Sequence, residues 1–209
     1  MIQHVLHVTS SIFGDHGQSS QLGSLLVETL REHRPGIEVT RRRLAADTIP
    51  HLDAETFAAF GTEAARRSPQ QQRQVELSDA LIAELQSADL LVLGLPMYNF
   101  AVPSTVKAWF DHLGRAGITF RYTANGPEGL LQGKRAVVIA SRGGQYTAET
   151  DTQTPYVNRF LSFIGIEQVE WIHVEGLAMG EAQATQSRAD AERTIASLAA
   201  RLLDAGASK

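Results

Sequence analysis

The sequence predicts an α/β fold in which five parallel strands form a doubly wound sheet between two layers of helices. Strand-like and helical segments alternate along the chain, which is the pattern of such three-layer sheets. The runs at 88–95 and 136–140 are almost wholly apolar, as strands buried on both faces must be. Short connections and right-handed crossovers favour a doubly wound arrangement. We therefore expect residues 1–209 to form a single domain of this class.

The first half of the chain contains two expected strands and two expected helices. Residues 2–9 are strand-like, and residues 37–44 alternate between apolar and polar side chains, which indicates a more exposed strand. The helix expected at 19–33 places four leucines on one face: Leu22, Leu25, Leu26 and Leu30. A second helix is expected at 69–87.

The second half repeats the alternation with three strands and three helices. The strands are expected at 88–95, 136–140 and 168–175, and the first and last of the helices at 103–115 and 182–204. We expect Thr154-Pro155 to cap the middle helix. Its apolar face would bury five side chains: Tyr156, Val157, Phe160, Leu161 and Ile164.

Two stretches stand outside this alternation. Residues 45–67 carry only weak helical signals, and residues 116–133 combine several glycines with aromatic and β-branched side chains. Ile118, Phe120 and Tyr122 recur there at period two, which is typical of a strand that needs cover from its own chain or from a partner. We expect both insertions to lie over the carboxyl end of the sheet or at a subunit interface.

Composition excludes several classes of function. The chain has no cysteine, so disulfides, thiol nucleophiles and thiolate metal sites are excluded. The net charge of −4 gives no reason to expect nucleic acid or an anionic membrane as a partner. The Arg41-Arg42-Arg43 run is interpreted as a solvated face or edge-strand protection. No signal peptide or long apolar run is visible, so we expect a cytoplasmic protein.

The first candidate loop follows the first strand, at residues 9–20. It is rich in hydroxyls and glycine and ends where a helix begins, so its backbone amides could bind a phosphate. The alternative is that Ser19 or Ser20 simply caps the helix. No Gly-x-Gly-x-x-Gly follows this strand and no Gly-Lys-Ser/Thr occurs, which disfavours dinucleotide and Walker-type sites.

Two further candidate loops follow the strands expected at 88–95 and 136–140. Residues 95–100 put apolar and aromatic side chains at an exposed strand end, where a flat aromatic ligand could cover them. Residues 141–144 contain paired glycines that would let the backbone approach a ligand. The alternatives are a loop packed under its neighbours and an ordinary turn. No pair of histidines has metal-ligand spacing, and no Gly-x-Ser-x-Gly elbow of a serine hydrolase occurs.

Taken in order, these motifs resemble one known family. The resemblance rests on Ser10-Ser11 with Gln18-Ser19, Pro96 to Phe100, Ala116 to Thr123 with Asn125 to Leu130, Ser141 to Gly144, and Phe163 to Gly165. Over nearly its whole length the chain is similar to the FMN-dependent NADH-azoreductases, also called NADH:quinone oxidoreductases. The resemblance implies a flavodoxin-like fold, a non-covalent FMN and a homodimer with two active sites at its interface.

The resemblance also implies roles for particular residues. Those that would bind FMN are Ser11, Gly17, Gln18 and Ser19 at the phosphate, Met97, Tyr98, Asn99 and Phe100 along the isoalloxazine, and Ser141, Arg142, Gly143 and Gly144 at its polar edge. The aromatic residues that would stack on substrate are Phe120, Tyr122 and Phe163. No side chain is assigned as catalytic and no metal is implied, because the flavin carries the chemistry.

The implied activity is two-electron transfer from NADH or NADPH to quinones and aromatic azo compounds, with cleavage of the azo bond. Donor and acceptor would use one site in turn, which gives ping-pong kinetics. The alternatives are a flavodoxin-like one-electron carrier acting on protein partners and a non-catalytic flavin-binding protein. The length and the aromatic segment at 116–133 favour the enzyme. The chain departs from many relatives in having Gly17 where they have Ser, and in the segment 145–153.

Overall fold

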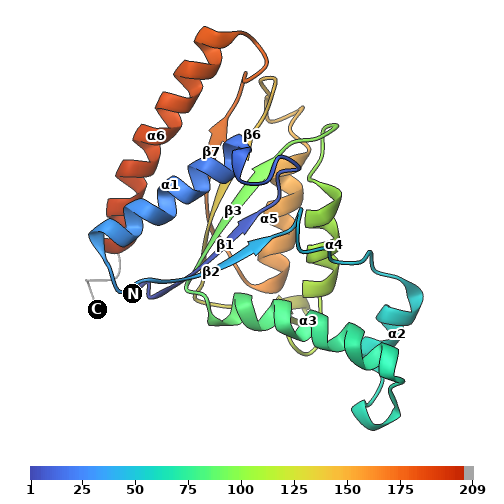
Figure 1. The fold of residues 1–209 in the computed structure, drawn as a ribbon. Coiled ribbons are helices and arrows are strands. Elements are labelled where there is room, and N and C mark those ends of the chain that lie inside the picture. Colours follow the sequence, from blue (N-terminus) through green and yellow to red (C-terminus); the bar gives the residue numbers. More distant parts are fainter. Residues whose placement is uncertain (205–209) are drawn as a thin grey trace.

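The main sheet of the molecule contains five parallel strands in the order β2-β1-β3-β6-β7 (Figure 1). The computed structural model describes residues 1–204. The strands are β1 (His4–Thr9), β2 (Glu38–Arg43), β3 (Leu90–Pro96), β6 (Arg135–Ser141) and β7 (Gln168–Val174). The predicted doubly wound α/β sheet is confirmed, and the strand ends differ from the expected ones by one or two residues.

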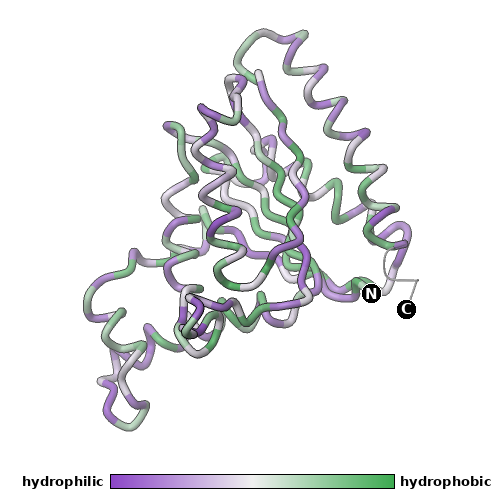
Figure 2. The backbone as a smooth tube through the Cα atoms, turned by 180° about the vertical axis from the view of Figure 1, so that it is seen from behind, coloured by the Kyte–Doolittle hydropathy of each residue, from purple (hydrophilic) through white to green (hydrophobic). Residues whose placement is uncertain are grey.

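Helices cover both faces of this sheet. Helices α1 (Gln18–His33) and α6 (Glu181–Asp204) lie on one face, while α3 (Pro69–Ser87), α4 (Ser104–Leu113) and α5 (Gln153–Ile164) lie on the other (Figure 1). Figure 2 shows hydrophobic residues along the central strands, and buried apolar side chains form one cluster on each face of the sheet. Each face therefore has its own apolar core.

The two cores follow from the sequence pattern. On the α1 face, three of the predicted leucines are fully buried and pack with apolar side chains of α6; they are Leu22, Leu26 and Leu30. On the other face, Trp109 and Phe110 of α4 pack with Leu161 of α5. Every residue of β3 is buried, because this central strand has neighbours and helices on all sides. Edge strand β2 is mostly exposed, as its alternating sequence predicts.

The two insertions form separate small elements. Residues 45–67 include α2 (Ala54–Gly61) and a short 3-10 helix, η2 (Ala64–Arg66), and α2 packs beside α3. The second insertion contains an antiparallel hairpin of β4 (Phe120–Thr123) and β5 (Gly126–Gly129). The hairpin packs at the carboxyl end of α5, where the Leu131 amide donates to the Ile164 carbonyl at 2.9 Å. It thus lies toward the amino edge of the sheet, away from the carboxyl edge.

Two details of α5 correct the sequence-based expectation. Thr154-Pro155 does not cap the helix, which begins at Gln153. The Asp151 carboxylate accepts hydrogen bonds from the amides of Gln153 and Thr154 at 2.9 and 3.0 Å, and so performs the capping. Of the five side chains expected to be buried, Tyr156 and Phe160 are only half-buried. Among the helices of residues 1–204, none has the length and hydrophobicity of a bilayer-spanning segment.

Candidate functional site

Three loops leave the carboxyl ends of β1, β3 and β6, and hydrogen bonds join them into one surface. The Met97 amide donates to the Ser141 carbonyl at 3.0 Å, which links the second loop to the third. The Tyr98 hydroxyl accepts from the Ile12 amide at 3.2 Å and lies 3.3 Å from the Ser11 hydroxyl, which links the second loop to the first. The structure therefore brings together the three segments that the sequence singled out.

The first loop ends at a helix N-terminus that has no side-chain cap. The N-cap of α1 is Gly17, and no side chain caps this end. The alternative that Ser19 or Ser20 caps the helix is wrong, because both serines lie inside the first turn. Both are fully buried, and neither hydroxyl has a partner within the described residues. An uncapped helix start, with its free amides and positive end of the helix dipole, suits an anion.

Two glycines set the close packing around this helix start. A Cβ at Gly17 would lie 2.2 Å from Ser11 Oγ and 2.4 Å from Ser11 Cβ, so the Ser11 side chain occupies the space a larger residue would need. A Cβ at Gly94 in β3 would lie 3.0 Å from the Ser19 carbonyl oxygen. The Ser10 hydroxyl donates to the Gly94 carbonyl at 2.8 Å. The first loop is therefore tied directly to the central strand.

The second loop contains a strained tight turn. Asn99 and Phe100 have φ angles of 50° and 64°, and the amides and carbonyls of Tyr98 and Ala101 exchange two hydrogen bonds at 3.1 Å. Two consecutive left-handed residues between such a pair form a type I′ turn, which glycine or asparagine normally occupies. A phenylalanine there costs of the order of 1–3 kcal/mol, the strain typical of functional loops. The Thr152 hydroxyl helps to hold the turn by donating to the Phe100 carbonyl.

The strained turn leaves the Phe100 ring in the open. Phe100 is 67% exposed, and so are Phe13 at 66% and Ile12 at 67% on the neighbouring first loop. Met97 and Tyr98, in the same loop as Phe100, are half-buried. Apolar side chains gathered around one loop cluster mark a surface that binds something.

The third loop places the Arg142 guanidinium inside the protein. Arg142 is only 2% exposed and contacts Asp151 and Glu175, each at 2.9 Å, and the Thr154 hydroxyl at 3.0 Å. This ion pair fixes the start of α5 to the third loop. Since the guanidinium is bound to two carboxylates, the paired glycines, Gly143 and Gly144, are left as the part of this loop that can approach a ligand.

The pKa of Asp151 reflects this network. Burial alone would raise it, but hydrogen bonds from the side chain and backbone of Thr154 and the nearby Arg142 charge lower it to about 2. The Asp151 carboxylate is therefore ionised at neutral pH.

The three predicted substrate-stacking residues form a cluster elsewhere. The Phe120 ring lies 4.3 Å from the Phe163 ring and 5.4 Å from the Tyr122 ring, centroid to centroid. Phe120 is buried, whereas Tyr122 is 77% exposed. Helix α5 begins near the second loop, where the side-chain Nε2 of Gln153 donates to the Pro96 carbonyl at 3.0 Å, and ends at this cluster. Its 12 residues span about 18 Å, so a single chain does not bring the cluster to the three loops.

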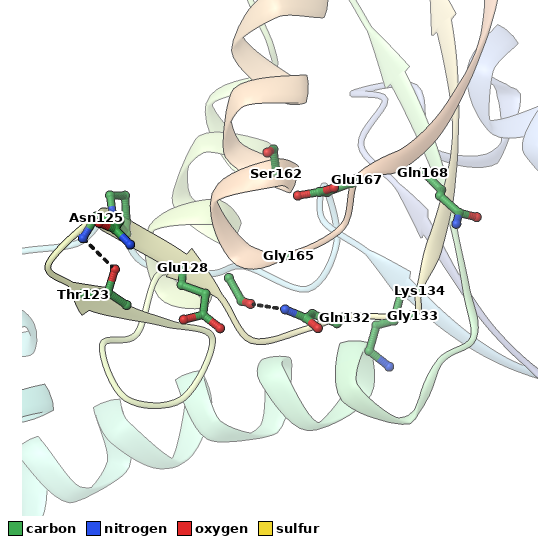
Figure 3. A pocket seen from close by; sticks show the side chains of 12 residues that line it. Thr123, Asn125, Glu128, Gln132, Gly133, Lys134, Ser162, Gly165, Glu167 and Gln168 are labelled. Atoms are coloured by element: carbon green, nitrogen blue, oxygen red, sulfur yellow. Dashed lines mark hydrogen bonds between the residues drawn. The ribbon is translucent and has the colours of Figure 1, made fainter.

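A cavity also lies at that far end. It has a volume of about 650 Å³ and is lined mainly by polar residues of the β4–β5 hairpin, the end of α5 and the start of β7, including Glu128, Gln132 and Glu167 (Figure 3). None of the predicted site residues lines it. Within residues 1–204, no group of three or more metal-ligating side chains comes together.

Sequence reasoning named Tyr98 as a site residue but missed the contacts that connect the loops, and it did not name Asp151 or Glu175. The Tyr98 hydroxyl, Asp151 and Glu175 act through contacts between segments far apart in the chain, which no local motif records. A weak signal existed for Asp151 only, as an acidic residue directly before an expected helix start.

Comparison with known proteins agrees with this architecture. The family model of the flavodoxin-like fold matches residues 3–199. An FMN-dependent NADH:quinone oxidoreductase of Cellvibrio japonicus (strain Ueda107) is 47% identical over 192 residues, covering 91% of this chain and 96% of the relative. Another, of Alcanivorax borkumensis, is 50% identical over 179 residues, covering 85% and 90%.

A solved structure extends the comparison to three dimensions. An FMN-dependent NADH-azoreductase from Bacillus anthracis str. Ames Ancestor, in complex with FMN, superposes with a TM-score of 0.86 at 25% identity, covering 95% of this chain and 99% of that one. The chain therefore belongs to the flavodoxin-like family of FMN-dependent NADH:quinone oxidoreductases and NADH-azoreductases.

Proposed function

We propose that this protein is an FMN-dependent oxidoreductase that transfers two electrons from NADH to quinones and aromatic azo compounds. Its relatives at 47% and 50% identity are named FMN-dependent NADH:quinone oxidoreductases. A structure of the same fold at 25% identity is an FMN-dependent NADH-azoreductase with FMN bound. The family resemblance of the sequence implies the same activity.

One observation carries the assignment to this chain: the first two loops lie on either side of the point where the strand order reverses. With the hairpin strands set aside, the order β2-β1-β3-β6-β7 is that of flavodoxin, in which the switch point between the first and third strands receives FMN. The loops after β1 and β3 are the ones joined through Tyr98 and Ser11. The uncapped α1 and the exposed apolar loops therefore meet at the point where this fold binds its cofactor.

The residues present fit FMN. The start of α1, with the free amides of its first turn and the buried Ser19 hydroxyl, suits the phosphate without a cation. Met97 to Phe100 would pack along the isoalloxazine, which would cover the exposed Phe100 ring. Gly143 and Gly144 would let the third loop approach the polar edge of the ring system. When bound, FMN accepts a hydride from the nicotinamide and passes the electrons to the acceptor.

The division of labour among residues follows from their chemistry. The hydroxyls and amides of the first loop would bind the FMN phosphate. The second loop would orient the isoalloxazine, because its turn is held by Tyr98, Thr152 and the Met97 amide. No side chain at the three loops is assigned as a general acid, so protons would come from water or from the cofactor. NADH and acceptor would occupy one site in turn, which is a ping-pong scheme.

We also propose that the working unit is a homodimer. Phe120, Tyr122 and Phe163 have polarisable faces suited to planar quinones and aryl azo groups, but their own chain holds them about one helix length from its loops. A second copy of the chain could bring its aromatic cluster over the first copy's loops. Such an arrangement uses the exposed Tyr122 and gives two equivalent sites, as a two-fold dimer requires.

Three further expectations accompany this proposal. Residues 1–209 would act as one domain, the location would be cytoplasmic, and NADPH could replace NADH to a degree that the sequence does not fix. Each of these remains a prediction.

The test is identification of the cofactor followed by turnover. Purified protein is heated, and the released flavin is separated against FMN and FAD standards. We expect one FMN for each chain, and then rapid NADH oxidation with a soluble quinone as the only acceptor. FAD, or no flavin after incubation with FMN, contradicts the cofactor assignment. Reoxidation only by a protein partner would favour the electron-carrier alternative.

A further inference from the structure

The last helix of the chain reaches the first turn of α1 through one side chain. Arg188 of α6 donates from Nη1 to the side-chain oxygens of Gln18 and Gln21, at 2.8 and 2.9 Å. Its Nε also donates to Glu192 at 3.2 Å. Gln18 is the first residue of α1, directly after the Gly17 N-cap, and it belongs to the predicted phosphate loop.

These contacts decide how the Gln18 amide is oriented. The oxygen and nitrogen of an amide are hard to tell apart by shape, but a guanidinium has donors and no acceptor. The amide atom that faces Arg188 must therefore be the oxygen, and the same holds for Gln21. The NH2 group of Gln18 is left as its free end, and an NH2 group donates to phosphate oxygens. Without Arg188 the amide could turn and present its oxygen, which repels a phosphate.

The position of Arg188 is fixed by the packing of α6 on α1. Ala191 and Ile195, three and seven residues further along α6, are 3% and 1% exposed and belong to the core shared with Leu22 and Leu26. One residue before Arg188, the Ser187 hydroxyl donates to the Glu175 carbonyl at 2.7 Å. The guanidinium is therefore held by a rigid helix pair, which limits the entropy lost when it orders the two amides.

We propose that Arg188 is a positioning residue for the phosphate of FMN: it fixes the Gln18 amide with its donors toward the anion and adds a positive charge beside the start of α1. The inference rests on the proposed binding of FMN. It predicts that Arg188 matters for a flavin that carries a phosphate and is irrelevant to one that lacks it.

The experiment compares FMN with riboflavin, which has the same ring system and ribityl chain but no phosphate. Full-length protein stripped of flavin is titrated with each ligand, and the quenching of flavin fluorescence gives the dissociation constants. Arg188→Met should weaken FMN binding by roughly tenfold, the size expected when a charge-assisted contact is lost, and leave riboflavin binding unchanged. Its FMN affinity should also depend less on ionic strength than that of the wild type.

Arg193→Met is the matched control. Arg193 lies on the same helix and pairs with Asp190, so this variant loses the same charge and a salt bridge but no contact with α1. It should bind both flavins like the wild type. If Arg188→Met proves unstable, Arg188→Lys, which keeps the charge but replaces the planar guanidinium with a compact ammonium on a flexible stem, should give an FMN affinity between those of wild type and the Met variant.

A double variant tests the route through Gln18. In a Gln18→Met background the Arg188→Met change should cost much less than tenfold, since the amide that Arg188 orients is gone. A full tenfold loss there contradicts positioning through Gln18. Equal losses for FMN and riboflavin, or no loss for either, overturn the inference while leaving FMN binding by the wild type intact. If the wild-type chain bound neither flavin, the proposed function itself would be contradicted.

Discussion

At the scale of single residues, the space around the start of α1 requires glycine at position 17. The φ and ψ angles of Gly17, −66° and 142°, are accessible to any residue, so its backbone does not require glycine. The surrounding space does require glycine, because the Ser11 side chain fills the position where a Cβ of residue 17 would lie. The Ser11 side chain is therefore packed against the start of α1.

This packing makes Gly17→Ala a sharp test of the phosphate loop. The new Cβ would overlap Ser11 Oγ and Cβ, so the loop must shift, and overpacking of this kind costs about 1–3 kcal/mol. We expect weaker FMN binding and a lower free energy of unfolding in urea. Gly36→Ala is the control, since nothing lies within 4 Å of a Cβ at Gly36. Wild-type FMN affinity in Gly17→Ala would show that the loop does not contact the phosphate as proposed.

The Tyr98 hydroxyl is a second single group that shapes the candidate site. It joins the first and second loops through Ser11 and the Ile12 amide. Tyr98→Phe should cost about 1 kcal/mol of stability and weaken FMN binding several-fold, because the two loops that we propose bind the flavin lose the hydrogen bonds that join them. Tyr156→Phe, whose hydroxyl makes no hydrogen bond within the described residues, should change neither quantity. Equal behaviour of the two variants in urea unfolding and flavin titration would contradict the role of Tyr98.

At the scale of elements, the start of α5 is held to the third loop by charge. Asp151 caps the helix and contacts Arg142, and its pKa is lowered to about 2 from 3.8. A carboxylate with a lowered folded-state pKa stabilises the protein above its unfolded pKa, and this contribution is lost as pH falls through the folded value. The stabilisation from this group should therefore disappear between about pH 4 and pH 2.

Asp151→Asn isolates this contribution. At pH 7 the variant should be less stable than wild type by about 2 kcal/mol, the size of the pKa shift expressed as a free energy. The difference should shrink as pH falls toward 2, where the wild-type carboxylate is protonated as well. Asp190→Asn, in an exposed pair with Arg193, should cost little at any pH. Urea unfolding at several pH values measures the free energy of unfolding of both variants. A stability difference between Asp151→Asn and the wild type that does not vary with pH would contradict the ion-pair explanation.

Elements were also the level at which the sequence was most informative. The apolar runs of β3 and β6 and the leucine face of α1 predicted those elements nearly to their ends, because burial imposes a period on the sequence. Caps and turns were less predictable. The type I′ turn at Asn99-Phe100 contains no glycine, and its conformation is imposed by contacts from Thr152 and Tyr98.

At the scale of the whole molecule, the sequence indicated candidate parts of the site but not the distances between them. Motif order indicated both the loops and the aromatic cluster, yet α5 separates them. The bond between Arg188 and Gln18 joins residues 170 positions apart, which periodicity cannot reveal. Long-range contacts depend on how α1 and α6 pack, and that follows only from the folded chain.

Complementation between two defective variants tests the dimer. Ser19→Asp would set a carboxylate against the phosphate, and Phe163→Ala would remove part of the aromatic cluster. If each site combines loops of one copy with aromatic residues of the other, mixed dimers contain one intact site of two. Random reassociation should then restore about a quarter of the wild-type activity. Light scattering should give twice the 22.8 kDa chain mass for each variant alone, as a control for folding. No recovered activity in confirmed mixed dimers would contradict a shared site.

The most direct test of the whole account is anaerobic mixing of the FMN-loaded protein with NADH alone, followed by a quinone. If the three loops hold FMN in a site that donor and acceptor use in turn, the visible flavin absorbance should fall in one phase with NADH and return when quinone is added. Initial-rate plots at several quinone concentrations should be parallel. Absorbance that falls only when both substrates are present, or intersecting plots, would mean that NADH and quinone bind together and would contradict the shared site.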